Sequence, residues 1–168
     1  MPFYRFGDLL AMGKIEAKYW IPYIMQGFEK TGKSISEEVA NRIPQLMENH
    51  PYYIQYLAYQ CWNLTEQECT DEIQDQAVAE LLMQQSILYQ REIDNLTNLQ
   101  LNFLKALSVG EKQFSSVAAN RKFNFGSPGN IKRIKEALEN REIIDITGKQ
   151  IEIGDPLFKI WINRNLLS

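Results

Sequence analysis

Large apolar residues recur at intervals of three and four along the first half of the chain, which is the spacing of a helical face. Helices are predicted at about residues 17–31, 36–48, 51–65 and 71–94. The third should bury Tyr53, Leu57, Ala58, Cys61 and Trp62, and the fourth Ile73, Ala77, Leu81, Leu82, Ile87 and Leu88. No strand pattern interrupts this region, so residues 17–94 are predicted to form an all-helical bundle.

The pattern changes after residue 95 to shorter helices followed by a hairpin. Helix starts are predicted at Thr97, at Ser115 or Ser116, and at Ser127-Pro128. Two β-branched runs then flank residues 147–149, which is typical of a β-hairpin, and a short helix closes the chain. Three helices and a hairpin make a winged helix, with the third helix as recognition helix and the hairpin as wing. The predicted fold class is mainly α: a helical bundle followed by a winged-helix domain with a small β-hairpin wing.

Charge divides the chain in the same way. The net charge is −3, but residues 1–94 carry 7 basic against 14 acidic residues, whereas residues 95–168 carry 11 against 7. A change of sign midway favours two modules, and the basic second module admits an acidic partner such as nucleic acid.

Residues 27–34 read GFEKTGKS, which matches the phosphate-binding loop of P-loop NTPases. That loop must follow a buried strand and open a helix, whereas the residues before Gly27 have helical spacing. We therefore predict that Gly27 lies inside a helix, that Gly32 ends it, and that Ser34 or Ser36 starts the next helix. The octet is interpreted as a junction between two helices and not as a nucleotide site.

An ordered set of segments resembles the C-terminal half of archaeal-type AAA+ ATPases, and also the related signal-transduction ATPases with numerous domains. The segments are FYRFGD, YWIPYIMQGFEKTGKSI, HPYYIQYL, LNFLKALSVG, GSPGNIKRIKEAL and IIDITGKQIEIGDPLFKIW. The resemblance covers nearly the whole chain. It implies that residues 1–16 are an extended arm left from the ATPase core, residues 17–94 a helical lid, and residues 95–168 a winged helix.

The resemblance does not extend to the catalytic core. The chain has neither a usable phosphate loop nor an aliphatic run ending in paired acids. The chain is therefore expected not to be an enzyme itself. The resemblance implies that the full-length parent is an ATPase, with ATP and magnesium as its cofactors. The missing N-terminal core would then be a partner, and the apolar arm could drive self-association through exposed edges.

In related ATPases a short Gly-x-Pro element at the start of a lid helix lies against the adenine. The matching residues here are Asn49, His50 and Pro51, with Asn49 where Gly is common. By resemblance, Pro51 would touch the base, with His50 or Tyr53 close by. The alternative is that Pro51 simply opens a helix, as Pro does in many proteins.

Basic residues gather in the second module. The predicted DNA contacts are Arg121, Lys122, Lys132, Arg133, Lys135 and Lys149. A basic recognition helix and wing are how winged helices meet the phosphates and groove edges of double-stranded DNA. Glu136, Glu139 and Glu142 lie in the same segment, however, and an exposed helix of mixed charge is often only a solvated surface.

Three functions follow from these observations. The chain is a regulatory part of an AAA+-type ATPase, a stand-alone winged-helix transcription regulator, or a protein-interaction module that binds no DNA. One His and two Cys make a metal site unexpected, and Cys61 and Cys69 are expected to be free thiols in a reducing cytoplasm. The sequence also shows no membrane-spanning run and no signal-peptide pattern.

Overall fold

A computed structural model describes residues 13–127 and 129–167. The chain divides into two compact units, one ending at Ile73 and one starting at Gln74, which are described separately. The predicted fold class is confirmed: the chain is mostly helical and includes a winged helix. Residues 1–12 of the arm predicted for residues 1–16 lie outside the described residues.

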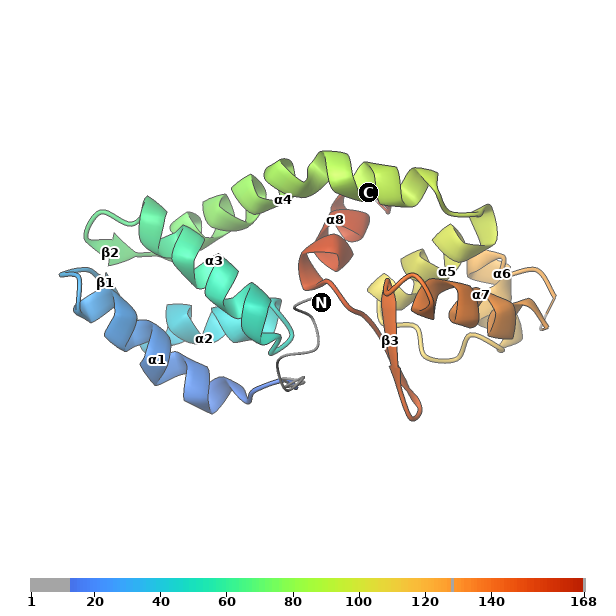
Figure 1. The fold of residues 1–168 in the computed structure, drawn as a ribbon, viewed down its shortest axis with the longest axis horizontal. Helices are drawn as coiled ribbons and strands as arrows, with labels where there is room; N and C mark the ends of the chain where they lie inside the picture. The colour runs from blue at the N-terminus through green and yellow to red at the C-terminus, as the bar shows by residue number, and fades with distance from the viewer. Residues whose placement is uncertain (1–12, 128, 168) are drawn as a thin grey trace, which may run out of the picture. The chain divides into compact units, whose positions relative to one another are not determined.

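Three helices form the body of the first unit (Figure 1): α1 (Ala17–Glu29), α2 (Glu37–Leu46) and α3 (Pro51–Leu64). Helix α2 packs against both α1 and α3. Its N-terminus is capped by Ser36, whose hydroxyl accepts a hydrogen bond from the Val39 amide. Trp20, Ile24 and Phe28 project from α1 at intervals of four and are buried, as their spacing predicts.

A small parallel sheet joins two loops of this unit. Strands β1 (Ser34–Ile35) and β2 (Glu68–Cys69) pair, with Ile35 opposite Cys69. The prediction that no strand interrupts residues 17–94 is therefore wrong. Two residues are too few to show the alternation that identifies a strand, and the pairing joins segments more than thirty residues apart.

Helix α4 (Asp71–Asp94) begins in the first unit and lies mostly in the second. Its second half packs against α8 (Pro156–Leu166) through Tyr89, whose ring contacts Phe158 and Trp161. Tyr89 also donates a hydrogen bond to Asp155, over 2.8 Å. The compact units thus divide within α4 after Ile73, whereas the module boundary expected from charge lies after residue 94.

The apolar face expected for α4 is partly wrong. Ile87 and Leu88 are 68% and 57% exposed, and Tyr89 and Ile93 are buried instead. The reason is that the buried face in this half of the helix is the one that meets α8, and Tyr89 and Ile93 share it at a spacing of four.

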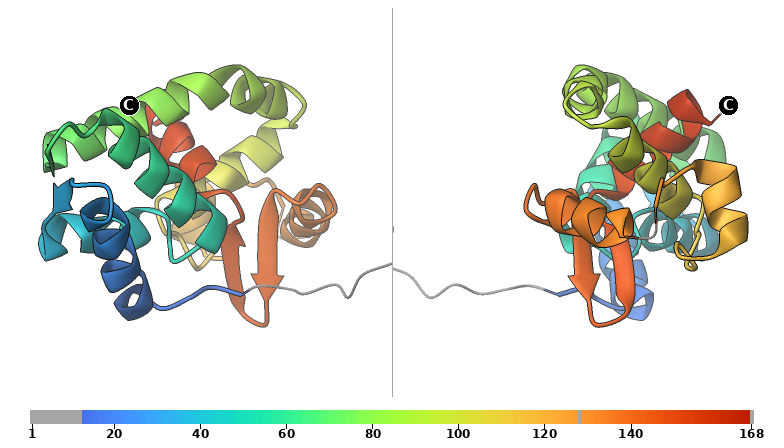
Figure 2. Two further views of the ribbon diagram at one scale, coloured as in Figure 1. Left: turned by 60° about the vertical axis from the view of Figure 1, so that its left-hand side comes forward. Right: turned by 90° about the vertical axis from the view of Figure 1, so that its right-hand side faces the viewer.

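The winged helix comprises α5 (Asn98–Ser108), α6 (Val117–Phe123), α7 (Asn130–Glu139), β3 (Ile144–Thr147) and β4 (Gln150–Ile153). Thr97 and Gln100 form a capping box at the start of α5. Helix α5 packs against α6, α7, α8 and β4, so it is the centre of this unit. The antiparallel wing is visible beside α7 in Figure 2. Gly148, with φ of 63°, opens its turn as a type II′ turn requires.

Aromatic and asparagine side chains fix the turn between α6 and α7. Phe125 is buried against Phe103 and Phe114, with ring centroids 6.0 Å apart in both pairs. The Asn120 side chain accepts a hydrogen bond from the Phe125 amide and donates one to the Gly126 carbonyl. Asn130 donates to the Phe125 carbonyl. These contacts set the position of α7, the predicted recognition helix.

Gly126→Ala tests this turn. Gly126 has φ of 74°, and an added Cβ would lie 2.5 Å from Nδ2 of Asn130. We expect the free energy of unfolding to fall by about 1–3 kcal/mol, because the substitution adds backbone strain and displaces the Asn130 amide. Urea denaturation followed by circular dichroism measures the change.

Gly129→Ala is the matched control. Gly129 has an ordinary helical φ of −65°, and a Cβ there meets nothing within 4 Å. Its effect should stay within about 0.5 kcal/mol. Equal losses in the two variants would contradict the role assigned to the turn.

Candidate functional site

The octet GFEKTGKS forms the end of a helix. Gly27 lies inside α1, and the chain leaves the helix through Gly32, which has φ of 75°. The Gly32 amide donates to the Glu29 carbonyl and the Lys33 amide to the Phe28 carbonyl, which is the Schellman pattern of a helix C-terminus. The predicted positions of Gly27, Gly32 and the Ser36 cap are confirmed, and the segment before Gly27 is a helix.

Lys33, which would reach the phosphates in a P-loop, is bound to α3 instead. Its ammonium donates to the Trp62 carbonyl over 2.7 Å and lies 4.3 Å from the centroid of the Trp62 ring. Thr31 accepts a hydrogen bond from the Trp62 indole over 2.9 Å. The polar residues of this octet therefore tie the end of α1 to the C-terminal turn of α3.

The three residues predicted to approach an adenine lie together at the start of α3. His50 is the N-cap residue, Pro51 the first helical residue, and the rings of His50 and Tyr53 are 5.3 Å apart. Asn49 has φ of 61°, in the left-handed region that Gly and Asn tolerate best, which accounts for an Asn where Gly is common. The structure thus gathers these residues, while their contact with a base stays a prediction.

The predicted DNA contacts lie on three successive elements of the winged helix. Arg121 and Lys122 are exposed in the last turn of α6. Lys132 and Arg133 are exposed on α7, and Lys149 is exposed in the turn of the wing. These five side chains are accessible to a large anionic partner.

Three of the predicted cations have partners within the unit. The ammonium of Lys122 lies 5.0 Å from the centroid of the neighbouring Phe123 ring. Lys132 lies 3.7 Å from Glu136, one helical turn away, in an exposed ion pair. Lys135 is half-buried, and its ammonium lies 5.6 Å from the centroid of the Phe114 ring. Exposed ion pairs are weak, so Lys132 can exchange Glu136 for a phosphate, whereas Lys135 is less accessible.

Acidic residues limit this surface. Glu139 and Glu142 are exposed at the end of α7 and beyond it. Asp145 and Glu152 lie opposite each other in the wing, so their carboxylates share one face of the hairpin. The arrangement can form phosphate contacts from α6, α7 and the turn of the wing, but positive and negative side chains both lie on this surface, and the negative ones weaken its attraction for an anion.

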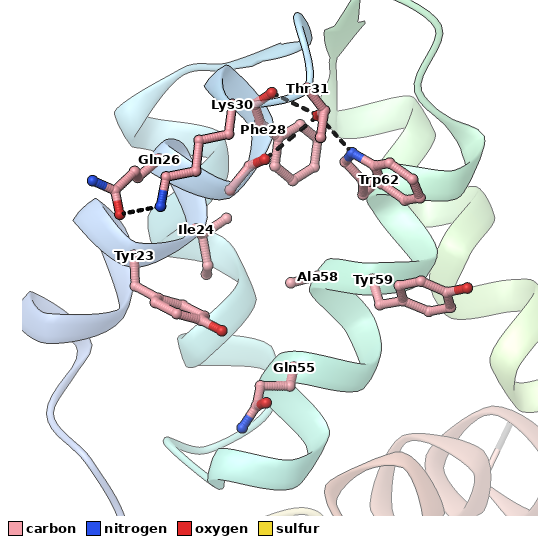
Figure 3. A pocket seen from close by; sticks show the side chains of 11 residues that line it. Tyr23, Ile24, Gln26, Phe28, Lys30, Thr31, Gln55, Ala58, Tyr59 and Trp62 are labelled. Carbon is pink, nitrogen blue, oxygen red and sulfur yellow. Dashed lines mark hydrogen bonds between the residues drawn. The ribbon is translucent and has the colours of Figure 1, made fainter.

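Sequence reasoning missed a groove between α1 and α3. It has a volume of about 590 Å³, and its walls carry Tyr23, Ile24, Phe28, Tyr59 and Trp62 (Figure 3). Ala58 and Trp62 were expected on the inner face of α3, but both line this groove. The available signal was Gly27, a glycine inside a helical pattern.

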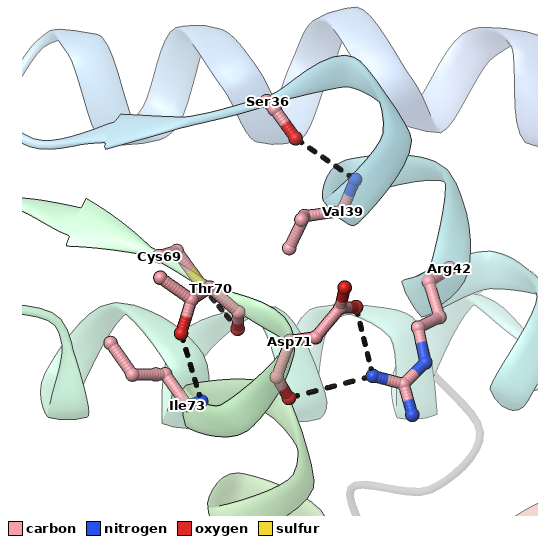
Figure 4. Close-up of polar contacts among 7 residues, drawn as sticks. All are labelled: Ser36, Val39, Arg42, Cys69, Thr70, Asp71 and Ile73. Atoms are coloured by element: carbon pink, nitrogen blue, oxygen red, sulfur yellow. Dashed lines mark hydrogen bonds and ion pairs between the residues drawn. The ribbon is translucent and has the colours of Figure 1, made fainter.

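Two cysteines meet where α3 and β2 approach each other. Cys61 and Cys69 are buried thiols, and a hydrogen bond to Cys69 together with burial raises the pKa of Cys61 far above its ordinary value. The same hydrogen bond lowers the pKa of Cys69 to about 7, against the opposing effect of burial. Beside them, Arg42 pairs with Asp71 over 3.0 Å (Figure 4).

Over residues 13–127 and 129–167, no group of three or more His, Cys, Asp and Glu residues is arranged to hold a metal ion. None of the helices in the described part of the chain combines the length and the apolar character needed to cross a membrane.

Comparisons with known proteins agree with the fold. Residues 87–164 match the family described as a probable winged helix domain. The Walker-type ATPase PABY2304 of Pyrococcus abyssi aligns with 89% of this chain at a TM-score of 0.67 and 11% sequence identity. The chain spans 42% of the length of that ATPase, and at this identity the likeness concerns the fold alone. Among proteins with curated functions, none matches the sequence.

Lys33→Ala distinguishes a helix end from a phosphate loop. Loss of the bond to the Trp62 carbonyl and of the contact with its ring should lower the free energy of unfolding by about 1 kcal/mol. Added ATP and magnesium should change the melting temperature of neither the variant nor the parent chain. Thermal denaturation with and without nucleotide measures both effects.

Lys30→Ala serves as the control, because Lys30 bonds only the exposed Gln26 side chain among the interactions described for it. Its stability should match that of the parent chain. A nucleotide-dependent rise in melting temperature that Lys33→Ala abolishes would show that the octet binds phosphate after all.

Proposed function

We propose that this chain is the lid and winged-helix part of a Walker-type ATPase, and that its winged helix binds double-stranded DNA. The observation that carries the first half is the alignment of 89% of the chain, including residues from both units, with an archaeal Walker-type ATPase. The winged-helix match supports the second half.

The nucleotide would be held mainly by a P-loop domain that the chain itself does not contain. Within this proposal the chain contributes the start of α3, where His50, Pro51 and Tyr53 lie together. Their surfaces suit an adenine ring, which gains from apolar and aromatic contact. Closure of the lid on nucleotide would then pass the nucleotide state to the winged helix.

Calorimetry with ATP and magnesium tests the association with an ATPase. The chain alone should not bind, and the chain joined to or mixed with the P-loop domain encoded with it should bind. In that assembly His50→Ala should weaken ATP binding about 3- to 10-fold through loss of contact with the base. Asn63→Ala, which changes an exposed residue near the end of α3 and outside the groove, is the control and should bind as the parent does.

Micromolar ATP affinity in the isolated chain would overturn this half of the proposal. So would the lack of any P-loop domain encoded in the same or an adjacent gene. Equal affinity of the His50→Ala and parent assemblies would remove the assigned adenine contact but leave the association with an ATPase intact.

DNA contact is supported by five exposed cations on α6, α7 and the wing, and by the positive net charge of residues 95–168. The exposed acids and the Lys132–Glu136 pair mean that binding would be electrostatic and modest. Base reading would contribute little, because Arg133 is the one exposed guanidinium on α7 and the amide of Asn130 is engaged with the Phe125 carbonyl.

Fluorescence anisotropy with a random-sequence duplex tests DNA contact. Affinity should fall steeply with salt, and replacing Lys132, Arg133 and Lys149 by Ala together should flatten the salt dependence by up to about 3 in log–log slope. Lys18→Ala, an exposed lysine in the first unit, should leave the slope unchanged.

Absence of any salt-sensitive binding at low ionic strength would leave the winged helix as a protein-interaction module. Salt-sensitive binding that the triple variant does not alter would place the DNA contact elsewhere on the chain.

A further inference from the structure

The groove between α1 and α3 is a feature that neither proposed role uses. It lies wholly within the first unit, has a volume of about 590 Å³ and is open to solvent. Figure 3 shows the side chains that line it. This volume falls in the range of pockets that hold small molecules. Tyr23 of α1 and Tyr59 of α3 are among the residues that line it, and each is 60% exposed. Aromatic side chains this exposed commonly mark a binding surface.

Gly27 lies on the wall of the groove, inside α1. A glycine in a helix interior lowers stability relative to alanine, so its presence needs a reason. A Cβ at Gly27 would meet nothing within 4 Å, and its backbone is helical, so neither crowding nor conformation requires glycine. What the missing side chain leaves is space, and across that space lies another small residue, Ala58.

Aromatic rings dominate the walls. Tyr59 and Trp62 are stacked, with ring centroids 6.1 Å apart and an angle of 21° between their planes. Tyr23 comes from the facing helix (Figure 3). Flat aromatic surfaces on two walls favour a planar aromatic occupant over a branched aliphatic one.

A single charge lines the groove. Lys30 lies at its rim, where its ammonium bonds the neutral Gln26 side chain over 3.2 Å. Thr31 is already engaged, because it donates to the Phe28 carbonyl and accepts from the Trp62 indole. A ligand with a single anionic group would therefore complement the single positive charge at this rim.

From these observations we propose that the groove between α1 and α3 binds a small planar aromatic anion. The rings of the ligand lie over the gap between Gly27 and Ala58, against Tyr23, and its carboxylate or sulfonate pairs with Lys30. The proposal does not depend on ATPase association or on DNA binding.

Anilinonaphthalene sulfonate is a suitable probe, since it is a fluorescent aromatic anion. N-Phenylnaphthylamine carries the same rings without charge and is the matched neutral probe. The chain should bind the anion more tightly than the neutral probe. Lys30→Glu should weaken the anion at least about fivefold and leave the neutral probe nearly unchanged.

Gly27→Leu tests the location without threatening the fold. Leucine is a better helix former than glycine, so the variant should melt at a higher temperature. Its side chain fills the gap, so binding of both probes should fall about tenfold or more. Lys18→Glu, an exposed lysine on the same helix outside the groove, should bind both probes as the parent does.

Unchanged binding in Gly27→Leu would overturn the proposal, because the probe would then sit elsewhere. Equal or tighter binding of the neutral probe, insensitive to Lys30→Glu, would also overturn it and would favour an apolar surface for a partner protein. Absence of binding of the anionic probe at millimolar concentration would overturn it outright.

Discussion

The hydrogen bond from Lys33 to the Trp62 carbonyl joins the end of α1 to the end of α3, and the first unit depends on it in two ways. It holds two helices in register at the point where the chain turns through Gly32 into β1. It also occupies the ammonium group that a phosphate loop would need for its ligand. The same contact therefore organises the scaffold and removes the chemistry that the local sequence suggests.

The second unit is organised around buried aromatic rings. Phe103 and Phe114 are stacked with centroids 4.3 Å apart, and Phe125 lies against both. Because Phe125 belongs to the turn before α7, its burial fixes where that helix starts. The asparagine bonds then satisfy the backbone of the turn, which would otherwise leave polar groups unpaired beside an apolar core. The exposed cations of α7 thus rest on a rigid support.

Local signals were enough to predict most of the helices and the wing. Caps such as Ser36 and Thr97 lie where their sequence context placed them, because a cap is determined by residues three positions away. Pairing of β1 with β2 was not predictable, since it joins segments far apart in the chain. The prediction that Ile87 and Leu88 are buried was wrong for a related reason, because the position of α8 decides which face of this half of α4 is buried.

The candidate sites also divide into features that local sequence determines and features that depend on packing between distant segments. That His50, Pro51 and Tyr53 lie together follows from their place in one helical turn. That Lys135 lies over the Phe114 ring, and so is less accessible than its neighbours, depends on packing between separate elements. The groove is the clearest case, because its walls come from two helices whose contact no local pattern specifies.

The charge pattern on α7 also restricts how a nucleic acid could be recognised. Lys132 and Arg133 are adjacent in sequence and point to different parts of the helix surface, so they cannot read one base pair together. Glu136 lies one turn beyond Lys132, and Glu139 is exposed near the end of the helix. Carboxylates at these positions would repel DNA phosphates. Attraction must then come from cations spread over α6, α7 and the wing, each near a different phosphate. Such contacts add affinity without sequence preference, so any choice of DNA site would have to come from a second copy of the winged helix or from the assembly to which it belongs.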